Sequence, residues 1–386
     1  MSKMKVYLDN AATTKVDEKV LKEMLPYFTE KYGNSSSMHL MGNEAKSALE
    51  KARHTIAKSV NAKTTEIYFT SGGTEANNWV LKGLFWKNQK LETGKNHLIT
   101  TKIEHDSILK PCERLEKQGG KITYLDVNKE GFIDLEQLKK AITKETFLVS
   151  IMHGNNEIGT IQDIEKIGKI CKEKNVLFHT DACQSYTKIP IDVKKTNIDF
   201  LTLNAHKIHG PKGIGALYIK EGIEMTYLLH GGGHEKGKRS GTQNIPGIVG
   251  FAKAVEIANS KDVKKMEKLR DKFIEKILDI PNTTLNGPKE NRLPNNINIS
   301  FNDVEGESIG GYLENAGIFV STGSACMSNT LSSSHVLEAI KLKPLQANSS
   351  IRFSISKYTT EKDLDYLMKK IPDIIKKLRR LSPLVK

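Results

Sequence analysis

Short apolar runs rich in β-branched residues alternate with amphipathic stretches between about residues 60 and 260. This alternation is typical of βαβ units, in which helices connect the strands of a mainly parallel sheet. One amphipathic stretch, residues 157–175, places Ile164, Ile167, Ile170 and Cys171 on one face, which predicts a helix that buries the cysteine. The predicted strands are residues 67–70, 97–100, 121–125, 147–152, 176–179, 200–203 and 216–219.

The pattern changes after residue 260, where apolar positions recur at long helical spacing until Pro281. This predicts a connecting helix that leads into a smaller α+β domain. Its predicted strands are residues 297–301, 318–321 and 351–356, with residues 6–8 as an added N-terminal strand. We therefore expect a large domain over residues 13–259 and a small domain made of residues 1–12 and 260–386.

Composition narrows the class of protein. The chain has 386 residues, 38% hydrophobic and 27% charged, and this balance argues against a disordered or fibrous protein. The longest apolar runs fall far short of the ~20 residues that a membrane-spanning helix needs. The N-terminus lacks the apolar segment of a secretory signal. We expect a cytoplasmic protein without a membrane partner.

The net charge of +14, from 59 Lys and Arg against 45 Asp and Glu, favours acidic partners through a long-range field. The basic residues are nevertheless dispersed along the chain. Their densest run, residues 369–380, alternates with apolar residues at helical spacing, which indicates a solvated helix face. We therefore expect no direct contact with nucleic acid.

Sequence patterns for metal sites are incomplete. A calcium-loop spacing begins at Asp126 but has Gln137 where the clamping Glu belongs. His206 and His209 have helical spacing without an H-E-x-x-H motif, and neither a Walker A sequence nor a G-x-G-x-x-G fingerprint occurs. The cysteines form no C-x-x-C pair, which argues against a disulfide framework or structural zinc; they are Cys112, Cys171, Cys183 and Cys326. No resident metal is predicted.

Three strand ends carry candidate chemistry. The strand at residues 67–70 enters a small-residue turn with Gly73 and Thr74 before a helix, which suits a phosphate group. The alternative is an ordinary glycine-rich loop with Thr74 as the helix cap. Asp181 ends another strand and Lys207 follows a third, where a lysine in a partly dry pocket can form a Schiff base. Together a phosphate anchor, a carboxylate for a pyridinium nitrogen and an imine-forming amine predict pyridoxal phosphate as the cofactor.

Motifs spread over nearly the whole chain strengthen this prediction. The chain closely resembles the NifS/IscS-type cysteine desulfurases of the class V aminotransferase group. The resemblance implies an α/β fold of the fold-type I pyridoxal-phosphate transferases, with a mainly parallel seven-stranded sheet and a smaller α+β domain. It rests on residues 7–14, 32–34, 71–75, 104–105, 153–159, 206–207, 230–235, 239–242, 321–326 and 350–354.

The resemblance implies specific roles around the cofactor. Lys207 would carry the Schiff base, Asp181 would pair with the ring nitrogen, and Gln184 would bond the phenolic oxygen. His105 would stack on the ring and relay protons, as suits an imidazole that titrates near neutral pH; the alternative is a buried structural histidine. Asn204 stands where the family usually has Ser, so only its amide N–H could serve the phosphate. The other cofactor-binding residues would be Gly73, Thr74, Asn156, His206 and, from the second subunit of a homodimer, Thr242.

The resemblance also implies the substrate site. Asn156 and Arg352 would clamp the carboxylate of L-cysteine, with Asn34 as a further contact; the alternative for Arg352 is a surface strand charge. Cys326 would be the persulfide-forming nucleophile, on a loop of the long, mobile type, and could also be a transient iron–sulfur ligand. Cys183, next to the cofactor residues, is interpreted as packing.

The resulting hypothesis is a cysteine desulfurase that converts L-cysteine to L-alanine and passes sulfur from Cys326 to an iron–sulfur scaffold or another acceptor protein. An aminotransferase or a selenocysteine lyase on the same fold is the nearest enzymatic alternative, because the cofactor residues do not distinguish among them. A basic RNA-binding or scaffold protein without catalysis is the alternative of another class.

Overall fold

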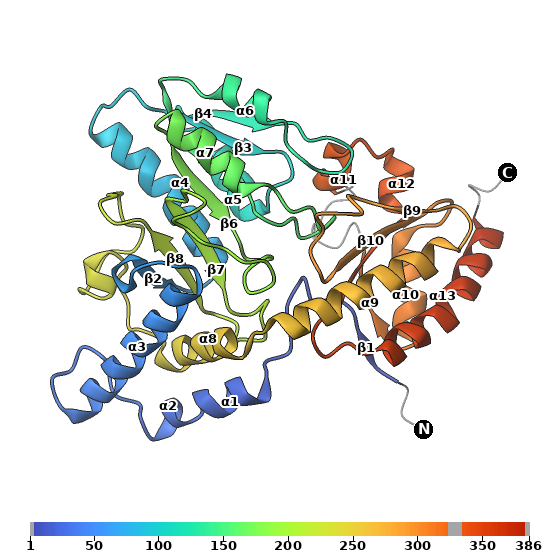
Figure 1. The fold of residues 1–386 in the computed structure, drawn as a ribbon, viewed down its shortest axis with the longest axis horizontal. Helices are drawn as coiled ribbons and strands as arrows, with labels where there is room; N and C mark the ends of the chain where they lie inside the picture. The colour runs from blue at the N-terminus through green and yellow to red at the C-terminus, as the bar shows by residue number, and fades with distance from the viewer. Residues whose placement is uncertain (1–3, 323–333, 383–386) are drawn as a thin grey trace.

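A computed structural model describes residues 4–322 and 334–382, and two lobes are joined by a long helix (Figure 1). The larger lobe contains a seven-stranded sheet in the order β2-β8-β7-β6-β5-β3-β4, in which β8 runs antiparallel to its neighbours. All seven strands predicted from the sequence are confirmed. They are β2 (Ile67–Thr70), β3 (His97–Thr101), β4 (Lys121–Leu125), β5 (Thr146–Ser150), β6 (Leu177–Asp181), β7 (Phe200–Asn204) and β8 (Gly215–Ile219).

Helices cover both faces of this sheet, which is why its central strands are almost wholly apolar and buried. On one face α4 (Gly73–Lys90) and α5 (Asp106–Glu116) pack on Leu98, Leu148 and Phe200. On the other face α3 (Leu40–Ser59), α7 (Ile164–Glu173) and α8 (Ile245–Ile257) pack on Ile99, Val149 and Leu201. The large lobe is completed by α1 (Glu18–Met24), α2 (Pro26–Thr29) and α6 (Leu135–Ala141).

One predicted boundary in this lobe is wrong. The helix expected over residues 157–175 begins only at Ile164, where the Asp163 side chain accepts a hydrogen bond from the Lys166 backbone N–H. The preceding residues form a turn in which the Asn155 side chain accepts hydrogen bonds from the N–H groups of Glu157 and Ile158. The helical part does bury Cys171 as expected.

The smaller lobe has its own apolar core around an antiparallel sheet of order β12-β13-β10-β9. The strand expected at residues 318–321 is divided in two: β11 pairs with the N-terminal strand β1, and β12 joins the main sheet of this lobe. The elements are β1 (Val6–Tyr7), β9 (Thr283–Leu285), β10 (Asn296–Phe301), α10 (Gly306–Asn315), β11 (Ile318–Phe319), β12 (Ser321–Thr322), α12 (Pro344–Asn348), β13 (Ser350–Ser354) and α13 (Glu361–Leu381).

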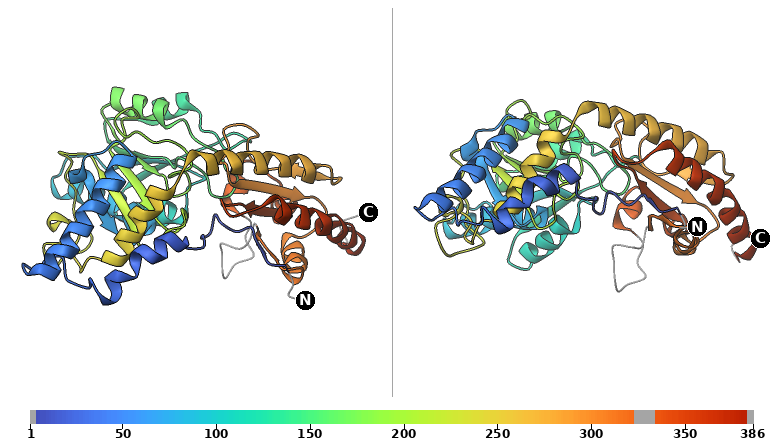
Figure 2. Two further views of the ribbon diagram at one scale, coloured as in Figure 1. Left: turned by 60° about the horizontal axis from the view of Figure 1, so that its bottom comes forward. Right: turned by 90° about the horizontal axis from the view of Figure 1, so that it is seen from below.

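Two helices connect the lobes. Helix α9 (Ser260–Leu278) starts beside α8 in the large lobe and packs its later turns in the small lobe (Figures 1 and 2). Helix α11 (His335–Ala339) returns to the large lobe, where Val336 and Leu337 form an apolar cluster with Ile103 and Met152. The ends of β3 and β5 are thereby fixed against the small lobe. No helix in residues 4–322 and 334–382 is long and apolar enough to span a bilayer.

Candidate active site

A cavity of about 250 Å³ lies at the carboxyl ends of the parallel strands. Ligands in open α/β sheets bind at this edge, because the loops that follow each strand meet there. The loops after β2, β3, β5, β6 and β7 all contribute. The lining residues are Ala12, Gly73, Thr74, His105, Ser107, Met152, Gly154, Asn156, Asp181, Cys183, Gln184, Asn204, His206 and Lys207.

Asp181 provides a buried negative charge in this cavity. Its side chain is held by the Asn77 amide, whose Nδ2 lies 2.7 Å from Oδ2, and by the Cys183 backbone N–H, 2.8 Å from Oδ1. Burial opposes ionisation, but these hydrogen bonds outweigh it and keep the pKa of Asp181 below its ordinary value. The carboxylate is therefore charged at neutral pH and able to pair with a cationic group.

His105 is held in one orientation at the start of α5. Its Nδ1 accepts a hydrogen bond from the Ser107 backbone N–H at 3.0 Å, so the proton of the neutral ring belongs on Nε2. Burial and the nearby Lys207 charge lower the pKa of His105. Asn77 links this residue to Asp181, because its amide also donates to the Ser107 hydroxyl at 2.8 Å. The structure thus presents a neutral imidazole.

The turn at Gly73 and Thr74 is open to the cavity. Helix α4 starts at Gly73 with Gly72 as its N-cap and no side-chain cap, so the alternative that Thr74 caps the helix is wrong. The free N–H groups of this first turn can bind an anion. Gly73 is required here, because a Cβ would lie 2.5 Å from the Cys183 sulfur. Burial and Lys207 lower the pKa of nearby His206 to about 4, so this imidazole is neutral.

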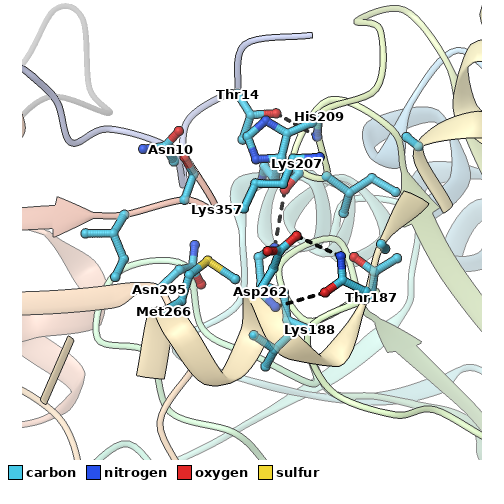
Figure 3. A pocket seen from close by; sticks show the side chains of 17 residues that line it. Asn10, Thr14, Thr187, Lys188, Lys207, His209, Asp262, Met266, Asn295 and Lys357 are labelled. Carbon is cyan, nitrogen blue, oxygen red and sulfur yellow. Dashed lines mark hydrogen bonds between the residues drawn. The ribbon is translucent and has the colours of Figure 1, made fainter. Parts of the chain in front are cut away.

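Lys207 lines this cavity and also a smaller one of about 50 Å³ between the lobes, which is the pocket drawn in Figure 3. Behind it lies Lys188, whose ammonium donates to the backbone carbonyls of Gln184 at 2.9 Å and Lys207 at 3.3 Å. Burial and repulsion from Lys207 lower the pKa of Lys188 to about 7. Lys188 thus fixes the backbone of the segment that carries Lys207.

Three amides complete the cavity wall. Gln184 donates from Nε2 to the Ala11 carbonyl at 2.9 Å, which fixes the side chain. Asn204 has a buried Oδ1 without a hydrogen-bond partner. The backbone carbonyl of Asn156 accepts a hydrogen bond from Arg352 Nη1 at 3.1 Å. These residues therefore lie where the sequence predicted them, around one cavity.

Arg352 is buried rather than a surface strand charge, so that alternative is wrong. It lies on β13 directly behind Asn156, and its Nη2 pairs with Asp9 at 2.9 Å. Its Nε is buried without a partner. The guanidinium thus contacts Asn156 of the cavity wall without lining the cavity itself.

Besides Arg352, two predicted site residues in the described part of the chain do not line this cavity. Asn34 and Thr242 are both exposed, and neither lines the cavity of its own chain. For Thr242 this agrees with an expected contribution to a second subunit, whereas Asn34 was expected without one. Cys326 lies outside the described residues. In the described part of the chain, no group of three or more His, Cys, Asp or Glu side chains could hold a metal ion.

The chain is similar over nearly its whole length to proteins of known family. A family model described as aminotransferase class-V matches residues 6–367. The chain belongs to this family. The chain is 50% identical to cysteine desulfurase IscS of Dictyoglomus turgidum over an alignment of 385 residues. This alignment covers 99% of the chain and 97% of the relative.

Two solved structures closely resemble this chain. A NifS-like protein superposes with a TM-score of 0.91 at 43% identity and covers 97% of this chain and 100% of its own. SspA in complex with cysteine superposes with a TM-score of 0.83 at 39% identity and covers 92% and 100%. The family resemblance and the fold class predicted from the sequence are confirmed.

The sequence alone did not indicate several residues that support the cavity. Asn77 was detectable in principle, because it lies one helical turn after Gly73 and Thr74 and therefore on the same face of α4. Ser107 lies two residues after His105. Lys188 gave no signal, because a lone lysine after a strand is usually solvated.

Proposed function

We propose that the protein is a pyridoxal-phosphate-dependent cysteine desulfurase, which converts L-cysteine to L-alanine and leaves the sulfur as a persulfide on Cys326. Relatives that match nearly the whole chain carry this name. The observation that carries the proposal is one cavity shared by Lys207, Asp181 and His105. An amine, a charged carboxylate and an imidazole are the groups that this cofactor needs from a protein.

The cavity fits the cofactor. The uncapped first turn of α4 at Gly73 and Thr74, with neutral His206, would bind the phosphate. Asn204 could add only its amide N–H, because its unpartnered Oδ1 is an acceptor like the phosphate oxygens. Asp181 is charged and would hold the ring nitrogen protonated. When bound, pyridoxal phosphate withdraws electrons from the α-carbon of an amino acid.

The protein's own groups would bind, orient and move protons. Lys207 would tether the cofactor and, once released, take the α-proton of the substrate. His105 would cover the ring and offer its Nε2–H, while the fixed Gln184 amide would bond the phenolic oxygen. Arg352 and Asn156 would bind the substrate carboxylate, which the partnerless Nε of Arg352 supports.

Sulfur transfer needs a nucleophile, and Cys326 is assigned that role from its sequence context. Its thiolate would attack the sulfur of bound cysteine, so that an S–S bond forms as the C–S bond breaks. The thiol proton ends on the β-carbon of alanine, and one thiol of the enzyme becomes a persulfide. An iron–sulfur scaffold or another acceptor protein would then remove this sulfur.

A homodimer and a cytoplasmic location belong to the same proposal. Exposed apolar side chains on and after α1 and α2, among them Phe28, Tyr32 and Met38, support a second copy as partner. The separate apolar cores support a large domain over residues 13–259 and a small domain over residues 1–12 and 260–386.

The decisive experiment follows the sulfur. Purified protein with pyridoxal phosphate and L-cysteine should produce alanine and a persulfide on Cys326 detectable by mass spectrometry, and borohydride should label Lys207. Cys326→Ala should keep the cofactor band but form no alanine. Cys171→Ala is the matched control, because Cys171 is buried on α7 in the core and does not line the cavity, so its loss should leave sulfur transfer intact. Alanine formation by Cys326→Ala would refute the proposal.

A further inference from the structure

Lys207 lines two cavities, the candidate active site and the cavity of about 50 Å³ between the lobes, which we call the interlobe cavity (Figure 3). Polar side chains of both lobes line the interlobe cavity, among them Lys188 from the large lobe and Asn295 from the small lobe. The reaction described above does not use this cavity. Its volume has room for about three water molecules.

Asn295 presents an acceptor that the protein itself does not satisfy. The residue is 2% exposed, and its Oδ1 has no hydrogen-bond partner among residues 4–322 and 334–382. Its backbone is fixed, because its carbonyl accepts a hydrogen bond from the Ile355 N–H at 3.0 Å. A buried acceptor that stays unpaired costs free energy. Since Asn295 lines the interlobe cavity, a water molecule there is the donor that this oxygen requires.

Lys188 offers a proton donor or acceptor to the same cavity. Its ammonium donates to the carbonyls of Gln184 at 2.9 Å and Lys207 at 3.3 Å, and an ammonium has a third N–H. This third position is left for the cavity that Lys188 lines. Burial and the Lys207 charge lower the pKa of Lys188 to about 7, so the ammonium and the neutral amine are both present at neutral pH. Lys188 can therefore release and accept a proton there.

A larger cavity of about 440 Å³ joins the interlobe cavity to the surface. The two cavities share several lining residues, and Lys188 is one of them. The larger cavity is also lined by Pro190, Ser260 and Lys264, which are exposed. Solvent therefore approaches Lys188 between the start of α9 and the segment that follows β6. Lys207, Lys188 and the surface lie along one polar route.

The proposed reaction gives Lys207 a proton to hold. Lys207 would take the α-proton of cysteine and later return a proton to the α-carbon of alanine. Cofactor and substrate would occupy the active-site cavity and exclude water from it. The interlobe cavity is then the side from which water still reaches Lys207.

We propose that water molecules in the interlobe cavity, held by Asn295 and Lys188, exchange protons between Lys207 and solvent. The Lys207 ammonium gives a proton to the water chain, the neutral amine of Lys188 takes one from it and passes one to solvent, and a solvent proton returns by the reverse steps. Only N–H and O–H bonds change, so the overall reaction keeps its balance. This inference rests on the proposed function, because Lys207 holds the α-proton only in that reaction.

The hydrogen at the α-carbon of alanine reports the exchange. Wild-type protein with pyridoxal phosphate and L-cysteine in deuterium oxide should form alanine with deuterium at this carbon, measured by proton NMR at low conversion. A Lys207 ammonium that keeps the substrate hydrogen beside two deuterons would return that hydrogen in about one turnover of three. Lys188→Met should therefore raise the retained fraction of substrate hydrogen by about fivefold or more.

Two further variants separate proton relay from structure. Lys188→Arg keeps the charge and the donors for both carbonyls but does not release a proton near neutral pH, so it should retain substrate hydrogen as Lys188→Met does. Lys172→Met, at an exposed lysine of α7 that lines neither cavity, is the matched control and should match wild type. A variant that is only slower gives Lys207 more time to exchange and would lower the retained fraction.

Asn295→Leu tests the water without changing Lys188. A crystal structure of the cofactor-loaded wild type should show an ordered water molecule within hydrogen-bond distance of Asn295 Oδ1, and the structure of the variant should lack it. The variant should also retain more substrate hydrogen than wild type. This second variant carries the test if Lys188→Met does not fold.

Two results would overturn the inference alone. One is alanine with the same α-hydrogen content from wild type, Lys188→Arg and Asn295→Leu, and the other is an Asn295 Oδ1 without a water molecule in the crystal structure. If the wild type forms no alanine, the proposed function fails and the inference fails with it, which is a different result from alanine of unchanged isotope content.

Discussion

Asn77 donates hydrogen bonds both to Asp181 and to the Ser107 hydroxyl beside His105. The substitution Asn77→Leu removes both hydrogen bonds while the volume of the side chain changes little. The Asp181 carboxylate then loses the donor to Oδ2, a hydrogen bond to a charged group that contributes about 2 kcal/mol. Because this hydrogen bond favours the charged form, its loss should raise the pKa of Asp181. The Asn77 Oδ1 is buried without a partner, so its loss costs nothing and partly offsets the damage.

The sign of the pH dependence follows from the direction of the shift. The lowered pKa of Asp181 stabilises the fold above the ordinary pKa of the carboxyl group, and this contribution disappears as the pH falls through the folded-state pKa. Asn77→Leu should therefore lower the free energy of unfolding of the apoprotein by about 2 kcal/mol at pH 7, and the difference should narrow as the pH falls through the raised pKa of Asp181 in the variant.

Urea unfolding followed by tryptophan fluorescence measures this difference, and equilibrium dialysis at pH 5 and 8 measures cofactor affinity. From pH 8 to pH 5 the affinity should fall more steeply in Asn77→Leu than in wild type, because the raised pKa of Asp181 brings its protonation closer to this range. Asn88→Leu, on the same helix but away from the cavity, is the control. Equal unfolding free energies and equal pH profiles for the two variants would refute the reasoning.

Two further predictions concern the walls of the cavity. Native Lys188 loses its proton near pH 7, whereas the same lysine in the unfolded chain loses it only near pH 10.5, so the unfolded state binds more protons between these values and the wild-type free energy of unfolding should rise with pH. Lys188→Met should lack this rise when urea unfolding is compared at pH 7 and 9. The same pH dependence in the variant and the wild type would contradict this prediction. Gly73→Ala should weaken cofactor binding at least tenfold in dialysis, because the new Cβ meets the Cys183 sulfur. Cys183→Ala should restore part of that loss, while Gly311→Ala, with open space around it, should have no effect on binding; failure of the rescue would contradict the steric explanation.

The main sheet was predictable from the sequence because all its strands except the edge strand β4 are largely buried and therefore appear as apolar runs. The same runs located Asp181 and Lys207 at strand ends, and parallel strands bring such ends together. Periodicity failed at residues 157–163, since Asn155 holds that segment as a turn through side-chain hydrogen bonds that leave no hydrophobic signal. The spacing of apolar residues predicts which positions are buried, but it does not predict turns that are held by side-chain hydrogen bonds to the backbone.

The polar framework behind the site was harder to foresee. Asn77 and Lys188 act through contacts between elements far apart in the chain, and neither residue type indicates burial by itself. The ion pair of Arg53 and Glu235 is of the same kind, because only the folded chain brings the two residues together. Such contacts depend on the relative position of elements, which a single sequence does not specify.

If Cys326 carries the sulfur as proposed, the packing of the small lobe sets the length of its tether. Thr322 pairs with Ile351 on β13, while Ser334 donates to Glu157 and begins the helix that packs on the large lobe. Cys326 follows Thr322 by four residues, so covalent geometry alone limits it to about 14 Å from that fixed strand. In the proposed reaction, an acceptor must therefore bring its receiving atom within this covalent reach of β12.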